Sequence, residues 1–116
     1  MVLAVGKKNK EKYGYYYGRK KFKKELRIAF ENIDSALSFT ADDYSIDIDD
    51  EVKLVVNDVV LGYLAVSKNA KSERLVKSKI KIPEEILVPG YNLLVLKQKK
   101  PGWKWGVTNI GLNPVN

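Results

Sequence analysis

Hydrophobic and polar residues alternate along most of this chain, in short runs that are separated by turn residues. In residues 25–33, Leu26, Ile28 and Phe30 would share one face of an extended strand, with polar residues mainly on the other. Comparable alternation recurs in four further runs, at 37–40, 52–56, 59–66 and 77–82. No segment has a long helical period, so the pattern predicts about nine short strands and an all-β sandwich or barrel.

Turn residues separate these runs and fix the remaining elements. Asn57 and Asp58 form a tight-turn dipeptide, which predicts a hairpin between 52–56 and 59–66. Residues 83–87 begin with Pro followed by two Glu, as in a single helical turn. Residues 91–97 are apolar on both faces, as expected for a central strand. A short first strand is expected at 2–5, and the last element is expected at 103–112.

Residues 42–51 contain six carboxylates and no Lys or Arg. Ile46 and Ile48 alternate with Asp47 and Asp49, which predicts a strand with the isoleucines in the core and the aspartates together on the opposite face. Clustered carboxylate oxygens are the ligands that Ca²⁺ prefers. The other interpretation is a solvated turn and sheet edge, whose charges keep strands of separate molecules from pairing.

The chain has 116 residues, which predicts a single domain spanning 1–116. It contains no Cys and no His, so thiolate metal sites, disulfides and the commonest general base are excluded. It also lacks a glycine-rich phosphate loop and a nucleophile elbow, and we do not expect an enzyme. No apolar run approaches membrane-spanning length, so membrane insertion is not expected. The first residues lack a basic region and have too short an apolar run for a signal peptide, so none is expected in them.

The positive charge is concentrated near the N-terminus. Residues 7–24 carry nine Lys or Arg and one acid, whereas the rest of the chain carries twelve basic and thirteen acidic residues. Three tyrosines with strand spacing precede the densest basic run, and together they could stack on bases and contact phosphates. The residues of this nucleic-acid or polyanion hypothesis are Tyr13, Tyr15, Tyr17, Arg19, Lys20 and Lys21. The other interpretation is a hairpin with packed tyrosines and solvated lysines.

Both tryptophans of the chain lie in the C-terminal motif PGWKWGVTN, at 101–109. In an extended strand Trp103, Trp105, Val107 and Asn109 would share a face. Two indoles and a carboxamide suit a sugar, because C–H faces of the ring stack on indole and hydroxyl groups bond to the amide. The alternative is that the tryptophans close one end of the sandwich.

Three segments resemble a module of large bacterial extracellular and surface proteins, whose pattern runs from a Tyr-x-Ile-Asp segment through a VNG…LGYL hairpin to a PGWxWGVT(D/N) end. They are VVNDVVLGYL at 55–64, PGYN at 89–92 and PGWKWGVTN at 101–109, and the resemblance covers roughly 38–112. It implies a jelly-roll β-sandwich, similar in layout to calcium-dependent xylan-binding modules of glycoside hydrolases. The chain departs from the pattern at Asp58, where the module usually has Gly. It also has Asn at position 109, whose side chain lacks the negative charge that Asp would bring to a metal site.

The leading hypothesis is therefore a non-catalytic, lectin-like carbohydrate-binding module that binds polysaccharide with the help of calcium. Asp47, Asp49 and Asn109, with Asp43 or Asp50 as further candidates, would hold Ca²⁺. Trp103, Trp105 and Tyr44 would form the sugar platform. The resemblance implies an extracellular or cell-surface location within a larger multidomain protein. Two alternatives to carbohydrate binding remain. One is the polyanion binding described above, and the other is a structural or adhesion domain that calcium only rigidifies.

Overall fold

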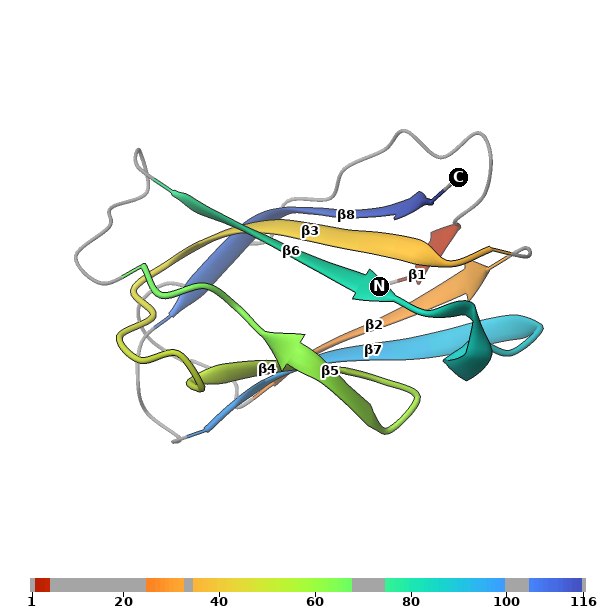
Figure 1. Cartoon of the computed structure of the whole chain (residues 1–116), viewed down its shortest axis with the longest axis horizontal. Coiled ribbons are helices and arrows are strands. Elements are labelled where there is room, and N and C mark those ends of the chain that lie inside the picture. Colours follow the sequence, from red (N-terminus) through yellow and green to blue (C-terminus); the bar gives the residue numbers. More distant parts are fainter. Residues whose placement is uncertain (1, 5–24, 33–34, 68–74, 100–104, 116) are drawn as a thin grey trace.

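A computed structural model describes residues 2–4, 25–32, 35–67, 75–99 and 105–115. Within these residues the chain forms eight strands and one short 3₁₀ turn, so the expected all-β sandwich is confirmed (Figure 1). The strands are β1 (Val2–Ala4), β2 (Glu25–Asn32), β3 (Leu37–Tyr44), β4 (Val52–Val56), β5 (Val59–Tyr63), β6 (Val76–Ile82), β7 (Gly90–Gln98) and β8 (Gly106–Pro114), with the turn η1 (Glu84–Ile86).

Two sheets form the layers of the sandwich. One has five strands in the order β1-β2-β7-β4-β5, and the other has three in the order β6-β3-β8. All neighbouring strands are antiparallel except β1 and β2, which are parallel. Successive strands repeatedly pass from one sheet to the other, as in a jelly roll (Figure 1). As expected from its apolar sequence, β7 is the central strand of the larger sheet.

The core lies between the two sheets and is built from the alternating apolar residues. In β4, Val52, Leu54 and Val56 are buried, whereas the residues between them are only partly covered. Phe30 from β2 and Phe39 from β3 join them as fully buried rings in the same cluster. Full burial of a side chain of this size stabilises the fold by roughly 1.5–3 kcal/mol, so the period-two pattern supplies the main driving force for the sandwich.

The expected turn at Asn57 and Asp58 joins β4 to β5, and both residues have positive φ angles, 49° and 69°. Asn and Asp tolerate this conformation, which primed hairpin turns require. The Asn57 amide group donates to the Ile86 carbonyl oxygen at 2.8 Å and to Asn92 Oδ1 at 2.7 Å, and its Oδ1 accepts from the Leu93 N–H at 3.0 Å. One side chain therefore ties the hairpin to η1 and to β7.

The prediction of a strand with Ile46 and Ile48 side by side is wrong. The strand β3 ends at Tyr44, and Ser45 has a left-handed φ of 64° that breaks the extended chain. Residues 46–51 form a compact turn in which Glu51 Oε1 accepts from the Asp47 N–H at 2.8 Å. Ile46 is fully buried, but Ile48 is 37% exposed because the turn no longer alternates its side chains between two faces.

A β-bulge in β8 corrects a second expectation. Thr40 pairs with Gly111 and Asp42 pairs with Thr108, so two residues of β8 lie opposite one residue of β3. Asn109 occupies the bulge with a φ of 54°. The inward-facing positions therefore change from odd to even numbers across the bulge, and Asn109 does not share a face with the buried Trp105 and Val107. The buried residues of β8 beyond the bulge include Ile110 and Leu112.

Candidate functional site

Two of the three residues of the expected aromatic platform, Trp105 and Tyr44, are buried. Trp105 is only 1% exposed and lies in the core cluster with Val107. Tyr44 is 8% exposed and its ring lies against Gly106, where a Cβ atom would overlap the ring carbons. Trp103 lies outside the described residues. A ring with both faces covered cannot stack on a sugar, so the assignment of Trp105 and Tyr44 to an open platform is corrected to a structural role.

The residues expected to bind calcium are divided between two places. Asp47 and Asp49 are exposed in the turn after β3. Asn109 lies instead at the β8 bulge, where its amide group donates to Asp42 Oδ2 at 3.0 Å. The described part of the chain contains no group of three acidic side chains that could hold a metal ion. The structure therefore places Asn109 beside Asp42, away from Asp47 and Asp49, which lie with the further candidate Asp50 in the turn after β3.

The residues of the polyanion hypothesis, Tyr13 to Lys21, all lie outside the described residues, and that hypothesis stays a prediction. No helix in the described part of the chain is both long enough and apolar enough to span a membrane.

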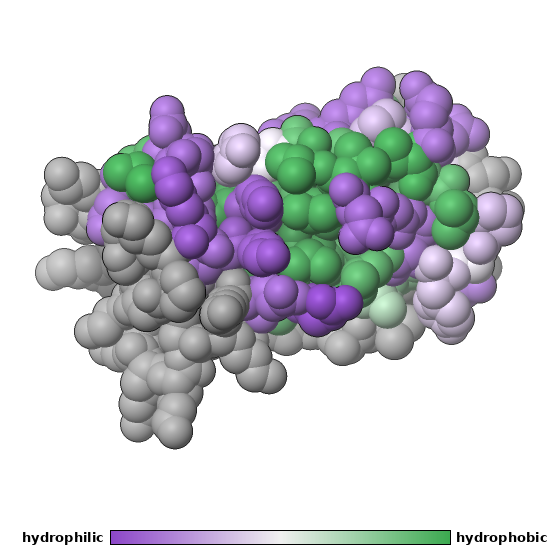
Figure 2. Space-filling view, turned by 90° about the horizontal axis from the view of Figure 1, so that it is seen from below, coloured by the Kyte–Doolittle hydropathy of each residue, from purple (hydrophilic) through white to green (hydrophobic). Residues whose placement is uncertain are grey.

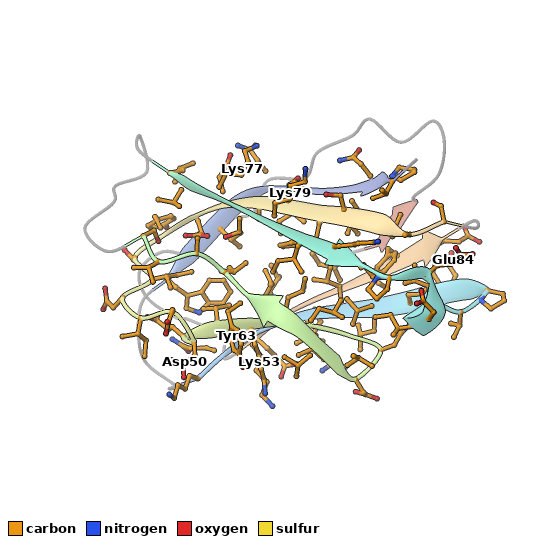
Figure 3. All side chains as sticks on the ribbon, in the orientation of Figure 1. Asp50, Lys53, Tyr63, Lys77, Lys79 and Glu84 are labelled. Atoms are coloured by element: carbon orange, nitrogen blue, oxygen red, sulfur yellow. The ribbon has the colours of Figure 1, made fainter. Side chains whose placement is uncertain are left out.

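A pocket of about 290 Å³ opens on the larger sheet, at the edge where β4 begins and β5 and β7 end. Ligand sites in proteins start at roughly this volume. Figure 3 shows Asp50, Lys53 and Tyr63 together on the side of this sheet that faces away from the three-stranded sheet. The pocket is lined by Asp50, Lys53, Tyr63, Lys97, Gln98 and Lys99.

Cross-strand pairing builds this pocket. Lys53 of β4 pairs with Tyr63 of β5 on one side and with Lys97 of β7 on the other. Side chains directly opposite each other in adjacent strands have Cβ atoms about 4.5–5.5 Å apart. The three side chains therefore form one row across three strands, and Tyr63, which is 46% exposed, stands at the outer end of the row.

The acidic turn reaches the pocket through Asp50. Lys99 Nζ donates to Asp50 Oδ2 at 2.8 Å, and the Lys99 N–H donates to the Glu51 carbonyl oxygen at 2.7 Å. The hydrogen bond from Lys99 lowers the pKa of Asp50, and the same bond raises the pKa of Lys99. Tyr63 and Asp49 also raise the pKa of Lys99 by weaker Coulombic interactions. The turn and the end of β7 are thus joined at the rim of the pocket.

Two other acids of the same stretch are buried beneath the surface. Asp43 Oδ2 accepts from the Ser78 hydroxyl group at 2.6 Å, and that hydroxyl oxygen accepts from the Ala65 N–H at 2.8 Å. Burial raises the pKa of Asp43, although Ser78 and Ser67 partly offset the effect. Burial also raises the pKa of Glu51. Asp43 was one of the further calcium candidates, and its contacts make it part of the interior framework.

The pocket residues were missed because no local motif marks them. Lys53 and Lys97 are ordinary polar positions in otherwise apolar strands, and Tyr63 lies in the LGYL segment that was read as a hairpin. The sequence shows only that each lysine is a polar residue within its own apolar strand. Only the register shows that they are opposite each other.

Comparison with protein families and with curated proteins does not assign the chain to a family. No protein-family model matches the chain, and no curated protein matches it. The similarity to the bacterial surface module therefore stays a resemblance.

Proposed function

We propose that this domain is a non-catalytic carbohydrate-binding module and that it binds sugar in the pocket around Tyr63. The observation that carries the proposal is a half-exposed tyrosine ring set in one row with hydrogen-bonding side chains. The apolar face of a sugar ring stacks on an aromatic ring, while its hydroxyl groups need donors and acceptors around the edge. Lys53 and Lys97 supply donors and Asp50 supplies acceptor oxygens within the pocket lining.

An apolar strip continues from the pocket along the same sheet and gives room for a longer ligand. Val55 pairs with Val60 on β5 and with Val95 on β7, directly beside the row that contains Tyr63. Figure 2, which looks at the molecule from below, shows hydrophobic residues gathered over this region, with hydrophilic residues beside them. Weakly polar C–H faces of further sugar units would lie on such a strip, which supports a polysaccharide as the partner.

The pocket also supports binding without catalysis. Glycoside hydrolysis normally uses two carboxyl groups that flank the scissile bond. Among the described residues of the pocket lining one carries a carboxylate, Asp50, and Lys99 is hydrogen-bonded to it. Binding followed by release of the intact sugar is the activity that we assign to this site.

Calcium assistance is a separate part of the proposal. The calcium ligands would be the exposed carboxylates of Asp47 and Asp49, which precede the pocket residue Asp50 in the chain. Carboxylate oxygens of this kind suit Ca²⁺. An extracellular or cell-surface location within a larger protein fits the same proposal. Neither is needed for the stacking of sugar on Tyr63.

Isothermal titration calorimetry against xylan, glucan and galactan oligosaccharides tests the proposal. We expect measurable binding by the wild-type domain and its loss in Tyr63→Ala. The matched control is Tyr91→Ala, because Tyr91 is 64% exposed on β7 of the same sheet but lies outside the pocket. Thermal melts of both variants check that they remain folded. Binding that survives Tyr63→Ala, or that is lost equally in Tyr91→Ala, would contradict the proposed site.

A further inference from the structure

Two lysines in the pocket lie directly opposite each other, and neither has a negatively charged partner among the residues that the structure describes. Lys53 and Lys97 are directly opposite in the β4–β7 register. Like charges in opposite positions of neighbouring strands destabilise a sheet. The ion pairs within the described residues join Arg27 to Glu25 and Lys99 to Asp50, and neither of the two lysines takes part in one.

The acids that could offset this repulsion are already engaged. Glu25 lies opposite Lys97 on β2, but its Oε2 accepts from Arg27 at 2.6 Å. Among the described residues of the pocket lining, Asp50 is the only one with a carboxylate, and it is hydrogen-bonded to Lys99. These described residues carry three ammonium groups and one carboxylate, which gives them an excess of two positive charges beside Tyr63.

We infer that the sugar bound in this pocket is acidic and that its carboxylate or sulfate group lies between Lys53 and Lys97. This inference rests on the proposed function and names its ligand class. The anionic group would offset the repulsion between the two ammonium groups and accept charge-assisted hydrogen bonds from both. Tyr63, next in the same row, would stack on the ring that carries the group.

The other basic surface of the described chain lacks these features. Lys77, Lys79 and Lys81 are exposed along β6 on the outer side of the three-stranded sheet (Figure 3 labels Lys77 and Lys79). Their β3 partners are Asp42, Thr40 and Ser38, which provide a carboxylate and two hydroxyl groups but no aromatic ring. This stripe attracts anions only by charge, so it supplies a matched control for the pocket.

The test compares two ligands, an oligogalacturonate and the same oligosaccharide after chemical reduction of its carboxyl groups. Each is titrated into the domain at about 0.15 M salt, where exposed charges are screened over about 8 Å. A sulfated oligosaccharide distinguishes sulfate from carboxylate, and a short oligothymidylate represents nucleic acid. The pocket variant is Lys53→Gln with Lys97→Gln. The control is Lys77→Gln with Lys79→Gln, which removes the same charge from the other sheet.

We expect an acidic oligosaccharide to bind more tightly than its reduced form, and the pocket variant to lose about tenfold or more of that affinity. The reduced form should lose less affinity in the pocket variant than the acidic form does, because glutamine keeps a hydrogen-bonding side chain at both positions but carries no charge. Equal binding of acidic and reduced forms that still depends on Tyr63 would overturn this inference and leave the proposed function intact. The inference also fails if both lysine variants weaken binding equally, or if oligothymidylate binds as tightly as the sugars through Lys53 and Lys97. Absence of binding to every oligosaccharide would reject the proposed function together with this inference.

Discussion

Replacement of Gly106 by Ala tests whether Tyr44 is a structural residue rather than a sugar platform. Gly106 is the β8 partner of Tyr44, and a Cβ atom at Gly106 would overlap Cε1, Cζ and the hydroxyl oxygen of the Tyr44 ring. The ring is 8% exposed, so it has little open space into which it could move. We expect Gly106→Ala to destabilise the domain strongly.

The magnitude follows from the cost of overpacking, which is about 1–3 kcal/mol when a group is forced into a packed interior. Tyr44→Leu offers the matched background, because Leu keeps apolar volume near the backbone but lacks the three ring atoms that Cβ would meet. In that background Gly106→Ala should cost much less. The coupling energy between the two positions should therefore be on the order of 1–3 kcal/mol.

Urea unfolding of the wild type, both single variants and the double variant measures this coupling. With a urea m-value of about 2 kcal/mol/M, a loss of about 2 kcal/mol lowers the midpoint by about 1 M. Circular dichroism of each variant without urea establishes that it is folded before its unfolding curve is fitted. Equal destabilisation by Gly106→Ala in the two backgrounds would refute the contact between the Tyr44 ring and Gly106, and with it the buried position of the ring.

Two further predictions concern the acidic stretch. Burial raises the pKa of Asp43 and of Glu51 in the folded protein. The unfolded chain releases these protons above a pKa of about 4, whereas the folded protein still holds them. The free energy of unfolding therefore falls as pH rises from that value through the raised pKa values. Urea unfolding at about pH 5 and about pH 7 should show this loss and Asp43→Asn should reduce it, whereas a wild-type stability that rises over this range would contradict the effect. Calcium should raise the melting temperature if Asp47 and Asp49 bind it, by a stabilisation of about 2.7 kcal/mol at a hundredfold excess over Kd. Asp47→Asn with Asp49→Asn should abolish that shift, and an unchanged melt of wild type with calcium and with EDTA would remove calcium from the proposed function.

The strands themselves could be predicted because their signal is local. Side chains of an extended chain alternate between two faces, and a run such as Leu26, Ile28 and Phe30 shows which face needs burial before any partner strand is known. The turn at Asn57 and Asp58 could be predicted for the same reason, since both residue types tolerate left-handed backbone. These features depend on neighbouring residues alone.

The errors occurred where the backbone leaves regular geometry. At Ser45 and at Asn109 a positive φ angle interrupts the strand, and each interruption changes which following residues face inward. As a result, Ile48 is partly exposed, and Asn109 lies on a different face from Trp105. Asn and Ser also occur in regular strands, so their identity did not show that the alternation would shift there.

The sequence by itself determined that this protein is an all-β domain with apolar strand faces, an acidic stretch and one hairpin turn. Only the tertiary structure decided that Trp105 and Tyr44 are buried and that Lys53, Lys97 and Tyr63 form a pocket. Burial depends on which part of the opposite sheet covers a face. The meeting of Lys53 and Lys97 depends on a register between strands more than thirty residues apart, which hydrogen bonding across the whole sheet sets.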